Sequence, residues 1–231
     1  MAPVKHPSHG GNIYDAAREL KCNPSEIIDF SASINPLGPS PQVWKAVSTS
    51  RRLIHHYPDP DSWDLRLALA EFWKIHPGQI VAGNGSTELI DALPRALGIR
   101  RLLVVQPTFS EYAAAMTRAG GQVRSLYADR NHQYAIPLDR LCRGLETGRV
   151  EGRSIDALIL CQPNSPTGQA CTVEEISQLA QTACRYNRWL IIDESFADYC
   201  PDRSVLRRAV SWPQVVVLRS MTKFYALPGL R

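Results

Sequence analysis

Four short apolar runs, rich in branched side chains, constrain the fold of this 231-residue chain more than any other feature. They cover residues 102–105, 155–160, 189–192 and 215–218, and polar or turn residues bound each run. Such runs are typical of strands that are buried on both faces of a sheet. Helix-like stretches alternate with them from about Trp63 onward, so the sequence predicts an α/β fold with a mostly parallel sheet flanked by helices.

Local signals place helices between these strands. Thr172 and Glu175 form a capping box at the start of a helix that runs toward Asn187, and residues 110–118 form a helix that stops at Gly120. Prolines break the first sixty residues into turns with at most two short helices; these prolines are Pro24, Pro36, Pro39, Pro41, Pro58 and Pro60. We expect this segment to cross the surface and not to join the sheet.

Composition and charge bear on the partners and the compartment of the protein, and they say little about its reaction. The formal charge of +4 is spread along the chain, which gives no sign of a nucleic-acid or membrane partner. No apolar run approaches the roughly 20 residues of a membrane helix, and no secretory leader opens the chain. The six cysteines form no C-x-x-C pair, so we expect idle thiols, no metal site and a cytoplasmic protein.

Lys223 belongs to the strongest chemical motif, residues 220–231, which follows the last predicted strand. Ligands of open α/β sheets bind beyond the carboxyl ends of the strands. The amine of a lysine placed there can form an imine with an aldehyde, while Ser220 and Arg231 offer a hydroxyl and a guanidinium to a phosphate. Asp193 ends another strand on the same rim, where its carboxylate can pair with a protonated pyridine nitrogen.

Two further turns are predicted on this rim. Asn164 and Ser165 lie in a Pro- and Gly-containing turn after a buried strand, where an amide or hydroxyl can reach a phenolic oxygen. Gly85, Ser86 and Thr87 open a helix whose free N–H groups suit a phosphate. Each motif alone predicts only an ordinary turn, and a lone lysine predicts a surface residue. Their shared position is what favours a cofactor site.

These elements, in this order, resemble the fold-type-I pyridoxal phosphate enzymes of the aminotransferase superfamily over nearly the whole chain. Within that superfamily the chain is similar to threonine-phosphate decarboxylases of cobalamin biosynthesis, and after them to histidinol-phosphate aminotransferases. The motifs that carry the resemblance lie at residues 9–12, 29–38, 57–59 and 218–225.

The resemblance implies pyridoxal 5'-phosphate as the cofactor and assigns roles to single residues. Lys223 matches the Schiff-base lysine, and Asp193 matches the partner of the pyridine nitrogen. The other positions are Gly85, Ser86, Thr87, Ser220 and Arg231 for the phosphate, Phe109 for stacking on the ring, Asn164 and Ser165 for the phenolic oxygen, and His9, Gly10 and Ser33 for the substrate. Tyr57 matches a tyrosine that reaches the cofactor of a neighbouring subunit, which implies a homodimer.

Three positions bear on the reaction. Ser165 and Ser33 stand where the family pattern has asparagine, so each amide is replaced by a hydroxyl. Phe196 stands where many aminotransferases have tyrosine, and the decarboxylases have phenylalanine there too. The two serines depart from the family pattern, whereas Phe196 agrees with the decarboxylases, and the resemblance implies decarboxylation of O-phospho-L-threonine to aminopropanol phosphate. Transamination of histidinol phosphate or a similar amino acid is one alternative, and a truncated chain without catalysis is the other.

The resemblance also predicts the domain organisation. Residues 1–50 form an amino-terminal segment with the substrate loop and part of a small domain, and residues 51–231 form the large cofactor-binding domain. The chain ends at Arg231, just after the glycine turn at Gly229, where a new element is expected to begin. We therefore expect a truncated chain that lacks a carboxyl-terminal small domain.

Overall fold

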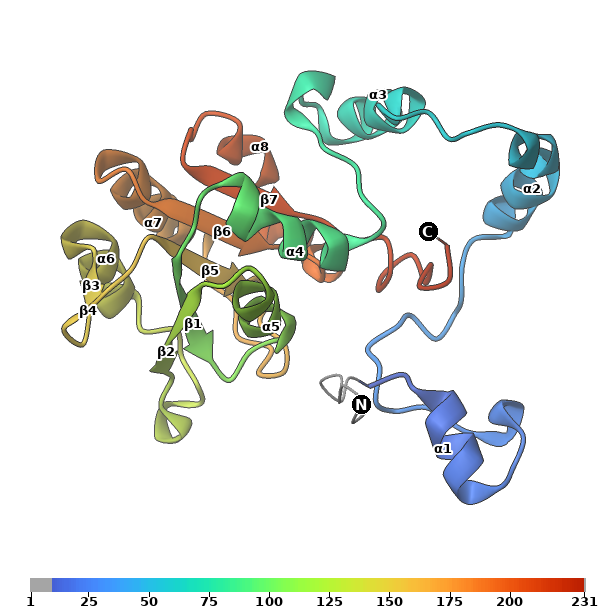
Figure 1. Cartoon of the computed structure of the whole chain (residues 1–231), viewed down its shortest axis with the longest axis horizontal. Coiled ribbons are helices and arrows are strands. Elements are labelled where there is room, and N and C mark those ends of the chain that lie inside the picture. Colours follow the sequence, from blue (N-terminus) through green and yellow to red (C-terminus); the bar gives the residue numbers. More distant parts are fainter. Residues whose placement is uncertain (1–9, 231) are drawn as a thin grey trace.

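The computed structural model describes residues 10–230, and a five-stranded parallel sheet forms the middle layer of its larger, helix-covered part (Figure 1). The strands lie in the order β2-β1-β5-β6-β7. Their bounds are β1 (Arg101–Gln106), β2 (Gln122–Tyr127), β5 (Ala157–Cys161), β6 (Trp189–Asp193) and β7 (Val215–Leu218). All four predicted runs lie in or overlap these strands. The fifth strand, β2, was not predicted because it lies at an edge and mixes polar with apolar residues.

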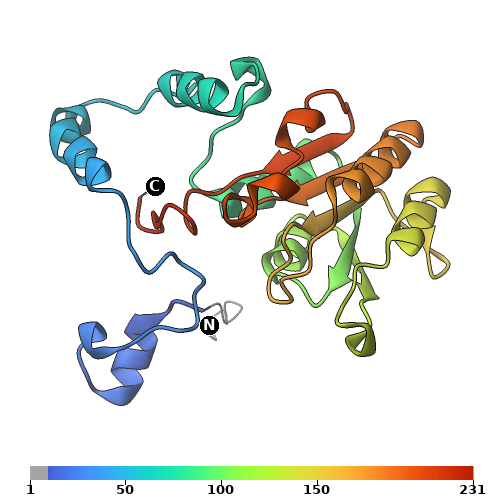
Figure 2. The ribbon, with the colours of Figure 1, turned by 180° about the vertical axis from the view of Figure 1, so that it is seen from behind.

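Helices cover both faces of the sheet (Figures 1 and 2). One layer contains α4 (Ser86–Ala96) and α5 (Glu111–Arg118), and the other contains α6 (Leu138–Thr147), α7 (Val173–Arg185) and α8 (Leu206–Ala209). A short hairpin of β3 (Arg149–Val150) and β4 (Arg153–Ser154) follows α6. The predicted α/β fold with flanking helices is confirmed.

The predicted helix signals are present in the structure. The hydroxyl of Thr172 accepts a hydrogen bond from the N–H of Glu175 at 3.1 Å, and the Glu175 carboxylate accepts one from the N–H of Thr172 at 2.7 Å. This capping box starts α7, which ends at Arg185, two residues before Asn187. The α5 helix is followed by Gly120 at a φ of 75°, a left-handed conformation that suits glycine at a helix end.

Alternating side chains along the strands form two separate cores. Leu103, Leu158 and Leu190 pack in the cluster that contains residues of α6 and α7. Val104 and Ile191 pack in the opposite cluster, with residues of α4 and α5. Because successive strand residues point to opposite faces, each apolar run contributes to both cores. This double burial holds the sheet rigid beneath the loops at its carboxyl edge.

The amino-terminal segment lies outside the sheet, as predicted. It contains α1 (Ile13–Leu20) and α2 (Pro41–Thr49), and with α3 (Trp63–Trp73) it forms an arc beside the sheet in both ribbon views (Figures 1 and 2). Short 3-10 helices complete the described residues: η1 (Pro24–Glu26), η2 (Ser50–His55), η3 (Pro77–Gln79), η4 (Arg130–His132), η5 (Ala197–Tyr199) and η6 (Pro201–Arg203). The boundary at residue 50 stays a prediction.

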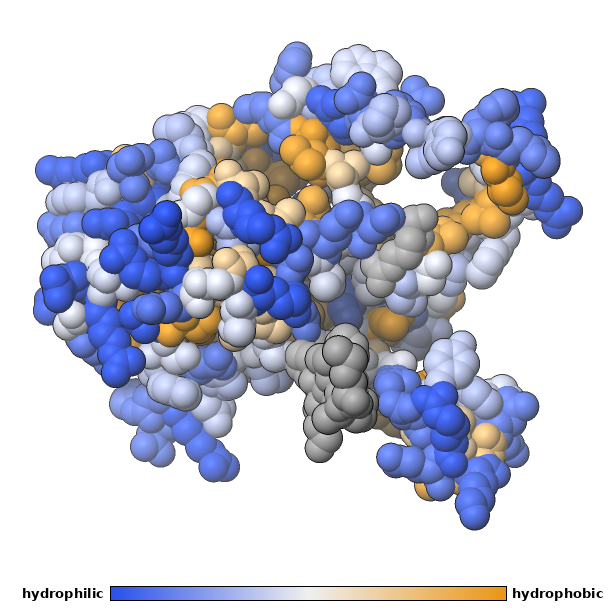
Figure 3. All heavy atoms as spheres, viewed as in Figure 1, coloured by the Kyte–Doolittle hydropathy of each residue, from blue (hydrophilic) through white to orange (hydrophobic). Residues whose placement is uncertain are grey.

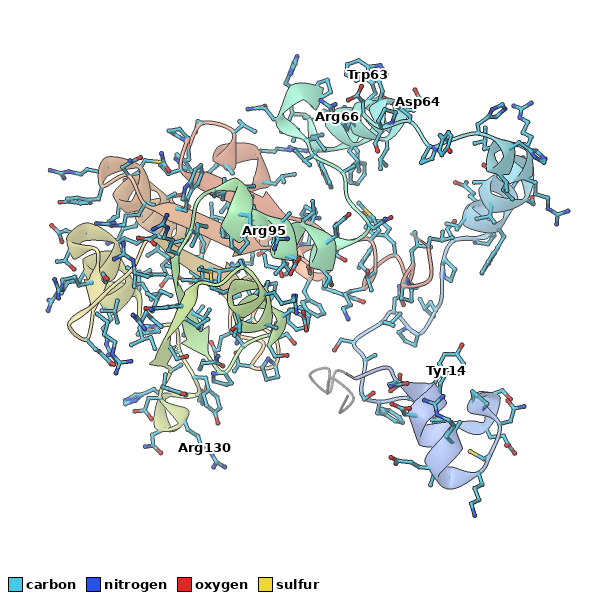
Figure 4. The ribbon with its side chains drawn as sticks, in the orientation of Figure 1. Tyr14, Trp63, Asp64, Arg66, Arg95 and Arg130 are labelled. Carbon is cyan, nitrogen blue, oxygen red and sulfur yellow. The ribbon has the colours of Figure 1, made fainter. Side chains whose placement is uncertain are left out.

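The arc exposes many large apolar side chains, and Figure 3 shows hydrophobic residues at the surface around α2. Phe30 is 95% exposed, Ile54 is 82% exposed and Trp44 is 62% exposed. The α3 helix is better anchored, because Arg66 donates to the carbonyl oxygen of Pro77 at 2.9 Å while its guanidinium lies 5.5 Å from the Trp63 ring (Figure 4). Among residues 10–230, we find no helix of the length and apolarity that crossing a membrane would require.

Leu158→Ala should test the importance of the double-sided core. Leu158 is fully buried at the centre of the sheet, so the variant loses packing and leaves a cavity. We expect the free energy of unfolding to fall by about 2–5 kcal/mol in urea titrations followed by circular dichroism. Leu20→Ala is the matched control, because Leu20 is 69% exposed. An equal loss in both variants would contradict this description of the core.

Candidate active site

The carboxyl ends of the five parallel strands meet at one edge of the sheet. The chain passes outward from β1 to β2 and then returns to β5 on the other side of β1, so the strand order reverses between β1 and β5. Ligands of open α/β sheets bind at such a reversal. Asp193 ends β6 at this edge, and the loops that leave β1, β5 and β7 carry Phe109, Asn164 and Lys223; all four were predicted as site residues.

Asp193 is a buried carboxylate that accepts hydrogen bonds from Ser195 and Tyr112. It is 2% exposed; Oδ1 accepts from the N–H of Ser195 at 2.9 Å and from its hydroxyl at 2.5 Å, and Oδ2 accepts from the hydroxyl of Tyr112 at 2.7 Å. Burial raises the pKa of Asp193, although these hydrogen bonds and the charge of Lys223 act in the opposite direction. A positive group that reached this carboxylate would relieve the cost of its burial.

Lys223 is half-buried and faces the same region. Burial lowers the pKa of its amine, and the negative charge of Asp193 partly opposes this shift. Its Nζ lies 5.9 Å from the centre of the Phe196 ring. Phe196 is the residue that stands where many aminotransferases have tyrosine. A lowered pKa makes the uncharged, nucleophilic amine available closer to neutral pH.

Asn164 joins two of the loops. Its Oδ1 accepts from the hydroxyl of Thr108 at 2.8 Å, and its Nδ2 donates to the carbonyl oxygen of Pro107 at 2.9 Å and to the hydroxyl of Thr167 at 2.7 Å. The contacts with Pro107 and Thr108 join the β1 and β5 loops, whereas the contact with Thr167 lies within the β5 loop. Both hydrogens of the Asn164 amide are engaged, and the half-buried hydroxyl of Ser165 is another donor of this turn.

The glycine-rich turn before α4 lies beside the loop that follows β7. Gly85 precedes Ser86, the first residue of α4, with a φ of 79° that favours glycine, and the N–H groups of the first helical turn suit an anion. Gly85, Ser220 and Thr222 line one hollow of about 360 Å³. The structure thus brings together two of the predicted phosphate-binding segments, which lie more than a hundred residues apart in the sequence.

The predicted substrate residues lie in the amino-terminal segment. Ser33 is exposed, and Gly10 packs so closely against Ser31 that its position leaves no space for a Cβ. Asn35 connects this segment to the lysine loop, because its N–H donates to the carbonyl oxygen of Lys223 at 3.0 Å. Its Nδ2 donates to the carbonyl oxygen of the next residue, also at 3.0 Å. His9 and Arg231 lie outside the described residues, and Tyr57 is 99% exposed.

Three residues of this site were missed from the sequence. Tyr112 follows Phe109 by one helical turn, and the two rings meet edge to face with centroids 5.6 Å apart. Ser195 follows Asp193 by two residues, a spacing at which an aspartate often accepts from the local backbone. Asn35 lies in the motif of residues 29–38, but the motif assigns no role to it. The first two spacings could have been noticed, whereas the partner of Asn35 lies 188 residues away.

The cysteines agree with the predicted idle thiols. All six are free, and burial raises the pKa of Cys161 and of Cys171 to about 12, so both thiols stay protonated at neutral pH. Within the described range, no group of three His, Cys, Asp or Glu side chains is arranged to hold a metal ion.

The sequence of this chain matches a known enzyme family. The family model for class I and II aminotransferases matches residues 25–231. The chain belongs to this family. Membership confirms the resemblance and the fold class predicted from the sequence, and it makes pyridoxal 5'-phosphate the cofactor that the site has to fit.

Individual relatives refine the comparison. The chain is 37% identical to the threonine-phosphate decarboxylase of Salmonella typhimurium over 225 residues, which cover 97% of this chain and 60% of that relative. It is 26% identical to the crystal structure of a histidinol-phosphate aminotransferase from Clostridium acetobutylicum, with a TM-score of 0.77 over 88% of this chain and 58% of the other. The chain spans about 60% of the length of the curated decarboxylase relatives it matches.

A third relative confirms the fold. The histidinol-phosphate aminotransferase of Sinorhizobium meliloti, solved in complex with pyridoxal-5'-phosphate, has a TM-score of 0.82 over 99% of this chain and 60% of that structure. At 20% identity this likeness describes the backbone alone.

Asp193→Asn should stabilise the cofactor-free protein at neutral pH. The pKa of Asp193 is raised in the folded state, so its ionised form opposes folding once the pH exceeds that pKa, whereas an amide is not charged. We expect the melting temperature of the variant to exceed that of the wild type at pH 7, and the difference to disappear as the pH falls below about 4.

The control for this measurement is Asp202→Asn, because the Asp202 side chain is 78% exposed. This variant should melt within about 1 °C of the wild type, since surface substitutions change stability little. An Asp193→Asn variant that melts below the wild type at pH 7 would contradict the assignment of Asp193 as a costly buried charge.

Proposed function

We propose that this chain binds pyridoxal 5'-phosphate and forms the cofactor-binding part of an enzyme that decarboxylates O-phospho-L-threonine to aminopropanol phosphate in cobalamin biosynthesis. The cofactor proposal is supported by the buried carboxylate of Asp193, which lies on the same rim of the sheet as the amine of Lys223. The observation that favours this substrate is the 37% identity to a threonine-phosphate decarboxylase across 97% of the chain.

The donor set fits the chemical groups of this cofactor. Lys223 would bind its aldehyde covalently, and Asp193 would accept the N–H of its pyridine nitrogen. Ser86, Thr87, Ser220 and Arg231 would hold its phosphate. Phe109 would contact the ring, and Ser165 would donate to the phenolic oxygen because the Asn164 amide is engaged elsewhere. When bound, this cofactor takes up the electrons of a bond broken at the substrate's α carbon.

The protein's own groups would then handle orientation and proton transfer. Asp193 would favour a protonated pyridine nitrogen, because a positive partner lowers the cost of its buried charge. Lys223, whose pKa is lowered, would give a proton to the substrate's α carbon. The apolar ring of Phe196 contacts this amine without offering it a hydrogen-bond acceptor.

Substrate selection is proposed to rest on the amino-terminal segment. His9, Gly10 and Ser33 would contact the phosphate and carboxylate of O-phospho-L-threonine, and their grip would turn the scissile bond perpendicular to the ring. Asn35 supports this arrangement, because it joins the same segment to the backbone of Lys223.

We further propose a cytoplasmic homodimer. Tyr57, which is 99% exposed, would reach the cofactor of the neighbouring subunit, and the exposed apolar side chains of the arc would be covered in that assembly. The free state of all six cysteines suits a reducing compartment. The proposed roles of Lys223 and Asp193 depend neither on a second subunit nor on the compartment.

A second candidate is transamination of histidinol phosphate or a similar amino acid. It is favoured by the likeness to the Clostridium acetobutylicum histidinol-phosphate aminotransferase at 26% identity and a TM-score of 0.77. In that case the same residues would hold the cofactor, and Lys223 would move a proton from the α carbon instead of returning one after decarboxylation. A folded chain without catalysis is the third candidate.

The substrate test uses the full-length protein encoded by the gene. With O-phospho-L-threonine and no keto acid, we expect one carbon dioxide released for each aminopropanol phosphate formed, because decarboxylation needs no amino-group acceptor. Turnover only with histidinol phosphate and 2-oxoglutarate would establish the second candidate. No turnover of either substrate by a protein that binds the cofactor would favour the third.

The cofactor test uses Lys223→Ala. The wild type mixed with pyridoxal 5'-phosphate should become yellow, and borohydride should bleach the colour and leave the cofactor attached to Lys223 in a digested peptide. The variant should give neither result, and its turnover should fall by about 10²–10⁴-fold or more. Lys74→Ala is the control, because Lys74 lies beyond α3 and outside the candidate site. A folded wild type that never takes up the cofactor would overturn the proposal.

A further inference from the structure

The last backbone hydrogen bond between β6 and β7 lies beside the candidate site. Asp193 and Leu218 are register partners, and the N–H of Glu194 donates to the carbonyl oxygen of Leu218 at 2.9 Å. Beyond this bond the segments that follow β6 and β7 separate, and the segment after β7 leads to Ser220 and Lys223. Any further fixed link between these two segments must come from side chains.

A buried ion pair provides that link. The Nη1 of Arg219 donates to Oε2 of Glu194 at 2.9 Å, so the pair joins the residue after Asp193 to the residue before Ser220. The Glu194 side chain is fully buried, and that of Arg219 is 11% exposed. Charges at this depth are tolerated only when they are paired and hydrogen-bonded, which makes the pair a strict geometric constraint.

Glu194 is held from a third segment of the chain. Its Oε1 accepts from the N–H of Val205 at 2.7 Å, and its Oε2 also accepts from the hydroxyl of Ser204 at 2.6 Å. With Arg219, three donors therefore serve this carboxylate. Its position cannot change without breaking several buried hydrogen bonds.

Asp198 binds the lysine loop at two points. Its Oδ1 accepts from Nη2 of Arg219 at 2.6 Å and from the hydroxyl of Tyr225 at 3.2 Å. Arg219 precedes Lys223 by four residues and Tyr225 follows it by two, so both flanks of the lysine are bound to one carboxylate. The guanidinium also lies 5.7 Å from the Trp73 ring of α3.

Glu194 does not itself face the site. Asp193 accepts from Tyr112 of α5, while Glu194 accepts from residues that follow η6. Adjacent residues of an extended chain point to opposite faces, so the two carboxylates have separate partners. The pair acts on the site through the backbones of its neighbours.

We propose that Glu194 and Arg219 are positioning residues whose ion pair fixes the distance and orientation between Asp193 and the turn that carries Ser220 and Lys223. The inference rests on the proposed function, because that function makes Asp193 and Lys223 the groups that hold the cofactor. Loss of the pair loosens the turn and exposes the amine of Lys223 to water.

The test is the double variant Glu194→Gln/Arg219→Met, which removes this ion pair and also the pair of Arg219 with Asp198. Glu194→Gln alone separates the two effects, because loss of a negative charge would lower the Lys223 midpoint, whereas loss of positioning would raise it. In cofactor-free protein, acetylation of Lys223 by acetic anhydride is followed against pH by peptide mass spectrometry. We expect the pH midpoint in the double variant to rise toward that of an ordinary lysine by about half a unit or more.

The matched control is Asp156→Asn/Arg101→Met, which removes an ion pair at the amino-terminal edge of the same sheet. Its Lys223 midpoint should equal that of the wild type, so general loss of stability cannot explain the shift. A folded double variant with the wild-type midpoint overturns the proposal.

A milder variant covers the case in which the double variant does not fold. Ser204→Ala removes one hydrogen bond to Glu194 and should give a smaller shift in the same direction. A folded Ser204→Ala variant with the wild-type midpoint then overturns the proposal.

Cofactor binding is measured separately. The double variant should bind pyridoxal 5'-phosphate about tenfold more weakly than the wild type, whereas the control pair should not change the affinity. A wild type that binds no cofactor counts against the proposed function alone, because the acetylation midpoint still decides whether the ion pair positions Lys223.

Discussion

The buried carboxylate of Asp193 is the constraint on which the rest of the site depends. It lies at the carboxyl end of β6, and Tyr112 and Ser195 occupy its oxygens as donors. Burial nevertheless raises its pKa, so the ionised form of Asp193 opposes folding. A cation in the crevice would reverse that penalty, which explains why a costly group is placed where it adds nothing to the core.

The parallel sheet is what gathers the other groups around this carboxylate. Both of its faces are buried, so side chains with chemistry are confined to the loops at its ends. Asn164 then joins the loops after β1 and β5, and the Glu194–Arg219 pair joins those after β6 and β7. The site is therefore supported by polar contacts between loops, each placed just beyond the last hydrogen bond of the sheet.

The sequence predicted what depends on local pattern. Apolar runs located four of the five strands, and the positions of Asp193 and Lys223 after such runs predicted that they share a rim. The edge strand β2 was missed because it is not buried on both faces. Contacts such as Tyr112 with Asp193, 81 residues apart, depend on how α5 packs on the sheet, and no local pattern encodes that. The roles of single residues toward the cofactor stay predictions.

A crystal structure of the protein grown with pyridoxal 5'-phosphate would show whether Asp193 and Lys223 hold the cofactor. We expect continuous density from Lys223 to the cofactor, the pyridine nitrogen within hydrogen-bond distance of Asp193, and the phosphate between the start of α4 and Ser220. Cofactor density away from Asp193, or a phosphate held by other loops, would contradict this expectation.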